Sequence, residues 1–503
     1  MKSQFLKSAN FHLFLKKHIQ FNLIFTLIIL NLIHCATSSE SGYNSKMVNI
    51  RNEYYSKNYD SATAELKDKY EDAADRDKLL YLMEAGIVFH AKGEYKKSIN
   101  LLKEAESIAE TLETSISKEA LSLIVNDTKN NFQGESFERV LIKLYIALGY
   151  MMDNDFENSK RYFRKINYDQ TQMKNEDSAY KQNLIARYLD AIVSELRGDY
   201  NDSRVQFKNL LAIKEDNLFV ADRLVLANKE KDPKDIAKFK KGENFILALD
   251  EKLSKTKYST NLGELIILNQ AGKAPLKKSR GKIGDSPEFA STLGVAVEIA
   301  IRTQSAAVSS TAVVLTMTQA ENPIPEYVKN PDSESNTKEI YINDSPIGTT
   351  DILFDYEALA LKNFNEKYPD MVKKNIANFA AKAVAAAVVA NVAANNPLAN
   401  KAKDDVKSRC PENLLCPLLV DIFVDLVAGV AAGAVAGSTF EPDLRCWSLL
   451  PANIQMKRIY LAPGTYQVKL KNADGSFTQP FTVTIEAGKP TLKNFISVSE
   501  NKG

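Results

Sequence analysis

A short pattern that recurs four times constrains this chain more than any other feature. In each copy a small or polar turn residue and an acid or amide lead into an aromatic. A small residue follows three positions later and a large apolar residue four beyond that, as in Gly93, Tyr95, Ser98 and Leu102. Glycine and asparagine tolerate the positive φ at which a helix ends and the chain reverses. Because residues i and i+4 lie on one helix face, the pattern predicts pairs of antiparallel helices.

The pattern resembles the tetratricopeptide (TPR) repeat, whose standard length is about 34 residues. Each preceding helix adds a small residue and an aromatic of its own. The positions that carry the pattern are Tyr59, Ala62, Gly86, Phe89, Gly93, Tyr95, Ser98, Ala147, Tyr150, Phe156, Ser159, Phe163, Gly198, Tyr200, Ser203 and Phe207. Stacked pairs of this kind form a concave surface that usually binds peptides or proteins. An ordinary bundle of amphipathic helices is the alternative interpretation.

The N-terminus carries the signals of an exported lipoprotein. An apolar run at 21–33 follows a leader with four lysines and no acidic residue, and it precedes Cys35. The run has signal-peptide length and is too short for a stable spanning helix. Residues 32–35 resemble a lipobox, so we expect a signal peptide at 1–34 and a tether at 35–45 that is lipidated at Cys35. Ala36 after the cysteine favours an outer-membrane lipoprotein that faces the periplasm; an uncleaved membrane anchor is the alternative.

The composition argues against nucleic-acid binding and against most catalytic sites. The formal net charge is +2, and without the leader lysines the chain becomes slightly acidic, so no nucleic-acid partner is expected. His90 is the only histidine outside the leader, and we expect it to be exposed or to face the groove. This excludes Ser-His-Asp, Cys-His and histidine-rich zinc sites. We predict no catalytic residue, metal or cofactor; a carboxylate-dependent envelope hydrolase remains an alternative.

The predicted fold class is α+β: a TPR-like helical array followed by a mixed region with an antiparallel β module and two long apolar helices. We expect helical repeats at 46–225, a helical linker at 226–257, a β-rich segment at 258–354, a helical hairpin at 355–440 and the β module at 441–503. Alternation predicts a strand at 263–268 and a hairpin of 339–342 with 350–354, while 308–318 fits a strand or a helix. Four strands, at 457–461, 466–471, 481–486 and 492–498, are expected to form one antiparallel sheet.

The segment 414–437 is strongly apolar and contains a row of small residues, Gly429, Gly433 and Gly437. Its apolar residues favour membrane insertion, but Asp421 and Asp425 offset that gain almost completely. We therefore favour a buried helix that packs on the alanine-rich helix at 375–394. The alternative is a membrane-inserting hairpin at 375–438 that oligomerises through the glycines.

Three blocks resemble a little-characterised family of bacterial envelope lipoproteins. They are residues 132–140, residues 263–277, and residues 443–451 together with 462–466. The resemblance implies a TPR-like half joined to a β-containing half, exported, with no established reaction. Its motif positions here are Gly134, Glu135, Asp443, Arg445, Trp447 and Pro451. From the residues themselves, we expect Glu135 to stabilise a helix N-terminus and Trp447 to fill the contact between the helices and the β module.

Three thiols remain besides Cys35. An exported protein often meets an oxidising compartment. Cys410 and Cys416 bracket a turn between the two apolar helices, so they are the expected disulfide. Pairing of either one with Cys446 is the alternative.

Together these features predict a lipid-anchored envelope scaffold whose helical groove binds another envelope protein and which catalyses no reaction. The membrane-inserting protein and the carboxylate hydrolase are the competing hypotheses.

Overall fold

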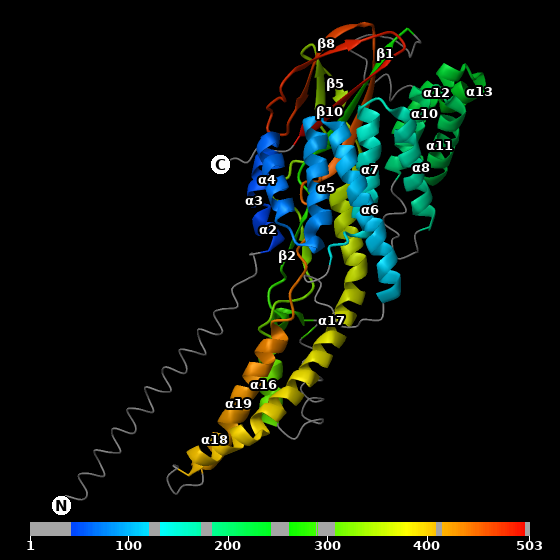
Figure 1. The fold of residues 1–503 in the computed structure, drawn as a ribbon. Coiled ribbons are helices and arrows are strands. Elements are labelled where there is room, and N and C mark those ends of the chain that lie inside the picture. Colours follow the sequence, from blue (N-terminus) through cyan, green and yellow to red (C-terminus); the bar gives the residue numbers. More distant parts are fainter. Residues whose placement is uncertain are drawn as a thin grey trace, which may run out of the picture. The chain divides into compact units, whose positions relative to one another are not determined.

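Helices pack as consecutive pairs through the first half of the chain (Figure 1). The computed structural model describes residues 42–119, 131–172, 184–242, 261–287, 289, 307–408 and 415–497. The pairs are α3 (Val48–Tyr55) with α4 (Tyr59–Glu71), α5 (Asp75–Lys92) with α6 (Tyr95–Glu119), α7 (Ser136–Met152) with α8 (Phe156–Gln172), and α10 (Ile185–Leu196) with α11 (Tyr200–Ile213). Then follow α12 (Asn217–Glu230), α13 (Pro233–Phe239) and η3 (Lys240–Gly242). We call this the helical array. The short helix α2 (Tyr43–Lys46) belongs to a separate N-terminal unit.

The turn inside each pair has the same geometry, because a residue with positive φ stands two positions before the aromatic. These residues are Lys57, Gly93, Asn154 and Gly198, and their φ angles lie between 60° and 82°. In the first pair this residue is Lys57, with φ of 64°, and not its neighbour Asn58, which has φ of −81° although asparagine tolerates positive φ better. A lysine rarely adopts this conformation, so the residue type did not mark the turn.

A recurring hydrogen bond supports the repeat from within. The Ser98 hydroxyl donates to the Gly86 carbonyl at 2.7 Å, and the Ser159 hydroxyl donates to the Ala147 carbonyl at 2.8 Å. Both serines are fully buried where the two helices of a pair cross. Gly86 permits this approach, because a Cβ there would stand 2.5 Å from the Leu102 side chain. The predicted small positions therefore serve close helix crossing.

Two β-sheets follow the array. The first has the order β10-β1-β7-β6, from β10 (Pro490–Ser497), β1 (Gly263–Ala271), β7 (Asn453–Leu461) and β6 (Asp351–Asp355). The second has the order β5-β4-β8-β9, from β5 (Ser345–Thr349), β4 (Glu339–Ile342), β8 (Gly464–Lys471) and β9 (Phe481–Ile485). Leu265, Ile267 and Ile459 of the first sheet share one apolar core with Ile340, Val468 and Val483 of the second. A small pair, β2 (Leu276–Lys278) with β3 (Glu326–Val328), lies outside both sheets.

The α+β class is confirmed, but several strand pairings differ from prediction. The four C-terminal strands do not form one sheet, since β7 and β10 flank β1 while β8 and β9 join β4. β10 pairs with β1 in parallel. The partner of 339–342 is 345–349, and 351–355 pairs with β7 instead. The ambiguous segment 308–318 is a helix, α16 (Ala307–Met317), with a short 3-10 turn η4 (Ile283–Asp285) before it.

Three helices form what we call the apolar helix bundle: α16, residues 375–395 of α17 (Tyr356–Asn395), and α19 (Leu415–Gly437), with α18 (Pro397–Lys407) between the last two. Gly433 and Gly437 of α19 face α16, because a Cβ on Gly433 would stand 2.7 Å from the Val313 carbonyl oxygen and one on Gly437 would stand 3.7 Å from the Met317 Cα. These glycines therefore serve a contact within the chain. The expectation that α19 is buried was wrong: it packs on α17, yet Leu426 and Val435 are 44% and 70% exposed.

The serine hydrogen bond gives a stability prediction with a built-in control. Ser159→Ala should lower the free energy of unfolding by about 1 kcal/mol, because the Ala147 carbonyl loses a buried donor. Ser203 is also fully buried, and its hydroxyl has no hydrogen-bond partner among the described residues. Ser203→Ala should therefore change stability little or raise it. Urea denaturation of both variants measures the difference; equal losses would contradict the assigned role of the hydroxyl.

Candidate functional site

The face of the array that the sequence predicts as a binding groove is occupied by the chain itself. The carboxylate of Glu84 in α5 accepts hydrogen bonds from the backbone N–H groups of Ser448 and Leu449, at 2.7 and 3.0 Å. Glu138 in α7 accepts one from the Trp447 N–H at 2.9 Å. The Tyr55 hydroxyl of α3 donates to the Ser448 carbonyl. The segment leading into β7 thus lies along three helices of the array, as an extended peptide would.

The three sequence blocks of the family resemblance meet at this contact. Lys277 of the second block forms an ion pair with Glu135 of the first at 2.9 Å. Arg445 of the third block binds Asp443 at 2.7 Å and Asp77 of α5 at 2.8 Å. Gly134 precedes α7 with φ of 68°, and Pro451 is buried just before β7. Glu135 is the N-cap residue of α7, as predicted, and forms a capping box with Glu138, whose carboxylate accepts a hydrogen bond from the Glu135 N–H at 2.8 Å.

Trp447 is fully buried at the contact between the helices and the β half, as predicted. Its ring packs against Tyr145 of α7 at 5.9 Å between centroids. Tyr145 in turn donates its hydroxyl to Gln270 of β1 at 2.8 Å. Trp447 therefore fills a joint within the protein and is closed to ligands.

His90 was expected to be exposed or to face the groove, and this was wrong. It is 1% exposed and lies between the rings of Tyr95 and Tyr145, at 5.2 and 5.3 Å. Burial lowers the pKa of His90 to about 3, so the ring is neutral at physiological pH. Neither ring nitrogen has a hydrogen-bond partner among the described residues. The side chain behaves as an aromatic core residue.

Arg458 of β7 joins the array to the first sheet through three carboxylates. Its guanidinium lies 2.8 Å from Glu195 of α10, 2.5 Å from Glu264 of β1 and 3.2 Å from Asp222 of α12. Lys229 also contacts Glu195. Burial would raise the pKa of Glu195, but Arg458 and Lys229 outweigh it and hold that pKa below its usual value. Burial raises the pKa of Asp222 to about 6 despite the same arginine.

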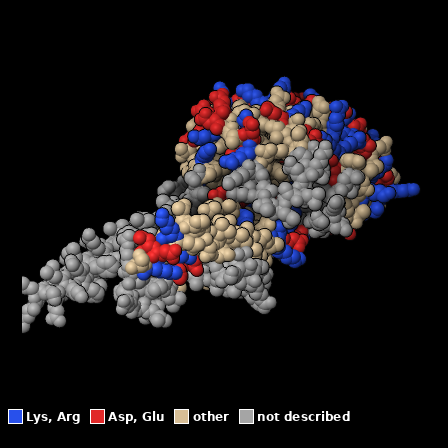
Figure 2. Space-filling model, turned by 60° about the horizontal axis from the view of Figure 1, so that its bottom comes forward, with Lys and Arg blue, Asp and Glu red and all other residues tan. Residues whose placement is uncertain are grey.

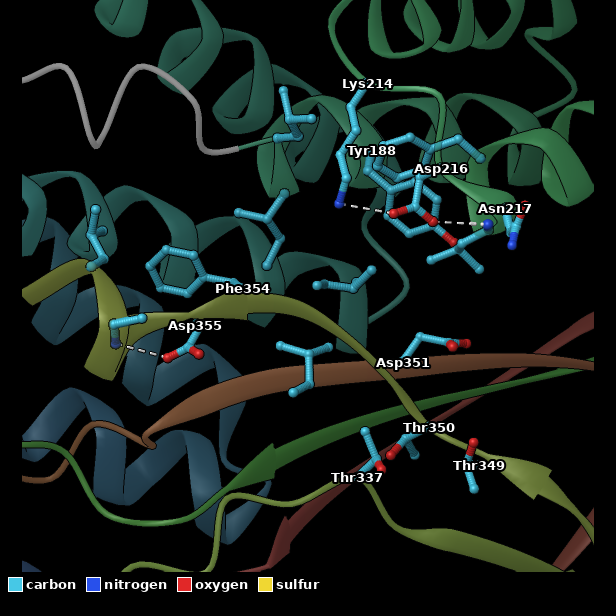
Figure 3. Close-up of a pocket in the computed structure, with 18 of the residues that line it drawn as sticks. Tyr188, Lys214, Asp216, Asn217, Thr337, Thr349, Thr350, Asp351, Phe354 and Asp355 are labelled. Atoms are coloured by element: carbon cyan, nitrogen blue, oxygen red, sulfur yellow. Dashed lines mark hydrogen bonds and ion pairs between the residues drawn. The ribbon is translucent and has the colours of Figure 1, made fainter. Parts of the chain in front are cut away.

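A cleft of about 860 Å³ opens where the last helices of the array face strand β6 (Figure 3). One wall is formed by α10 and the loop between α11 and α12, with Tyr188 and Lys214; the other by β6 and the first turns of α17. β6 is an edge strand, so its outer side has no neighbouring strand in the described sheet. Ile352 of β6 is 46% exposed there. Lys214 and Asp216 form an ion pair at 3.0 Å on the opposite wall.

Several predicted residues cannot be placed at a site. Cys35 and Cys410 lie outside the described residues, as does the side chain of Cys416. Cys446 is buried and forms no disulfide with any described residue, and burial raises the pKa of its thiol to about 12. Within the described ranges, no group of three or more His, Cys, Asp or Glu side chains is arranged to hold a metal ion.

Comparison with known proteins does not assign the chain. No family model matches the sequence. A search of curated proteins also finds no match.

The sequence reasoning missed the buried charges that define the joint. Glu84, Glu195 and Arg458 are at most 4% exposed, but only Glu84 interrupts a continuous apolar run, since Arg458 follows Lys457 and Glu195 stands two residues before Arg197. An isolated charge in an apolar window is the signal that was available, because a buried charge needs a partner. The partners of Glu84 and Arg458 lie between 194 and 365 residues away along the chain, so no local pattern identified them.

Removal of the Arg458 charge should destabilise the whole fold. Arg458→Met leaves Glu195, Glu264 and Asp222 buried with Lys229 as the remaining cation, and breaking such a cluster typically costs about 3–5 kcal/mol. Lys471→Met, which removes an exposed pairing with Glu339, is the control and should have little effect. Chemical denaturation of both variants tests this; similar midpoints would contradict it.

Glu138 should make stability depend on pH. Burial raises the pKa of Glu138 to about 7 in the folded state, above its ordinary value of 4.5. The folded state thus binds this proton more tightly, so the contribution to stability is present below pH 4.5 and is lost as pH rises through 7. The shift corresponds to about 3 kcal/mol. Glu138→Gln should flatten the fall in stability between pH 5 and pH 8; an unchanged pH profile would contradict this.

Proposed function

We propose that this chain is a lipid-anchored cell-envelope scaffold that binds a protein partner and has no catalytic activity. The anchor rests on the signal and lipobox-like sequence that ends at Cys35, and an outer-membrane position facing the periplasm rests on Ala36. Membership of the envelope lipoprotein family that the three blocks resemble belongs to the same proposal. The scaffold role rests on the array, because stacked helix pairs provide a rigid surface for protein recognition.

The partner site proposed here is the cleft beside β6. The inner face of the array is filled by the segment 445–458, which already satisfies the carboxylates of Glu84 and Glu138. Among the described residues, the cleft is one place where array helices present an open surface, and it combines a sheet edge with exposed Ile352 and ion-paired Lys214. This combination is the observation that supports the proposal best.

An extended segment of the partner fits this cleft. Edge strands offer backbone hydrogen bonds to an added strand, and neighbouring pockets select its side chains. The register between β6 and β7 shifts between Ile352 and Phe354, so the edge is regular over only a few residues. Side-chain contacts with the apolar wall and with Lys362 on α17 would therefore supply much of the selectivity.

Site-specific photocrosslinking in cells tests the cleft. A photoreactive phenylalanine analogue at position 352 should give one discrete protein adduct, while the same residue at Val205, 51% exposed on α11 outside the cleft lining, should not. Lys362→Glu reverses a charge in the cleft and should reduce the amount of adduct several-fold. Lys208→Glu, at an exposed position of α11 outside the cleft lining, should leave the amount unchanged. An identical adduct from position 205, or none from position 352, would remove the cleft from the proposal.

A further inference from the structure

We infer that the apolar helix bundle inserts into the hydrocarbon core of a lipid bilayer. A helix that is apolar on all sides belongs either in a protein core or in a membrane. The inner sides of these helices are covered: Ala383, Ala387 and Ala390 of α17 are fully buried. The outer sides are also apolar, and they are exposed. The exposed residues include Val388, Val389, Val392, Leu426, Val427 and Val435.

Length and burial both agree with a bilayer. Among the described residues, α17 and residues 420–437 of α19 are long and apolar enough to cross a membrane. Only 28% and 18% of their apolar 18-residue stretches are buried inside the protein. A core helix of the same composition would be mostly buried. Residues 375–395 of α17 extend about 30 Å at 1.5 Å per residue, and the hydrocarbon core of a bilayer is about 30 Å thick.

The two acidic residues of α19 are each paired with a lysine of α18. Asp425 is paired with Lys403 of α18 at 3.2 Å, and Asp421 with Lys407 at 2.7 Å. These two acids were the main argument against insertion of α19, and pairing lowers the cost of removing them from water. Lys382, the one charged residue between Lys374 and Lys401, donates to the Thr439 hydroxyl at 2.8 Å. In Figure 2 a broad uncharged surface lies beside a group of acidic and basic residues.

The chemistry of the outer surface favours lipid over a protein partner. A protein interface carries about one hydrogen bond per 100–200 Å² and a polar rim. From Leu426 to Gly437 every residue is Leu, Val, Ala or Gly, so no side chain there can form a hydrogen bond. A second copy is also a poor fit through the glycine row, because Gly433 and Gly437 already contact α16 and the segment after it. Lipid chains need no hydrogen bonds, and the proposed anchor at Cys35 would keep the chain beside a membrane.

Fluorescence quenching by brominated lipid tests the contact directly. The full chain carrying Val389→Trp is reconstituted in vesicles of phosphatidylethanolamine and phosphatidylglycerol with brominated acyl chains. The added tryptophan should lose at least half of its emission, while Tyr168→Trp, at a position 65% exposed on α8, should lose none. Trp447 is fully buried and gives a constant background. Equal quenching of the two added tryptophans would overturn the inference.

A binding assay separates this contact from the lipid anchor and from self-association. Cys35→Ala removes the proposed lipidation site, and this chain should still co-sediment with vesicles. Adding Val389→Asp and Val435→Asp should weaken its binding at least tenfold. Tyr168→Asp with Val205→Asp, at positions 65% and 51% exposed outside the bundle, should not weaken it. Circular dichroism checks that each variant is folded. Loss of vesicle binding with Cys35→Ala alone, or a lipid-free dimer that the bundle variants dissociate, would overturn the inference.

Discussion

The contact between Arg458 and three carboxylates determines how the two halves of this protein are joined. A guanidinium that is fully removed from water must be neutralised by its neighbours, and here the neighbours come from α10, α12 and β1. Glu84 and Glu138 add a second kind of contact, because their side chains accept hydrogen bonds from backbone N–H groups of residues 447–449. Separation of the array from the sheet would expose these charges without partners. The array and the β half therefore behave as one unit.

This joint changes what the helical repeats can do. In a TPR-like array the inner helices are expected to hold an extended peptide. Here the peptide is the chain's own segment between α19 and β7, and carboxylates fix its backbone while Trp447 fills the space beside Tyr145. A partner would have to displace hydrogen bonds to buried carboxylates, each of which costs more than an exposed contact. The open cleft beside β6 requires no such exchange, which is why the proposed partner site lies there.

Local rules predicted the local features well. The spacing of Tyr95, Ser98 and Leu102 located a helix pair because helix contacts repeat every three or four residues. Strand pairing is not local, so the alternation that located β7 and β10 could not reveal that both flank β1, in opposite directions. The burial of His90 and Arg458 was not predicted for a related reason. Whether a polar side chain is buried depends on the element packed against it, and those elements lie far away in the sequence. The joint itself was therefore not predicted, although the three sequence blocks that meet at it were identified.

The ion pairs of Asp421 and Asp425 change the prediction that the sequence of the apolar helix bundle supports. From the residues alone, the gain from the apolar side chains of α19 and the cost of Asp421 and Asp425 nearly cancel. The lysines of α18 alter that comparison, because each acid has a cation within 3.2 Å. The exposed valines then have no compensating role in a protein that stays in water. A bundle in the bilayer and a lipid at Cys35 would attach the chain at two points. A single flexible tether would leave the protein free to rotate, whereas two attachments would fix which surface faces the aqueous compartment.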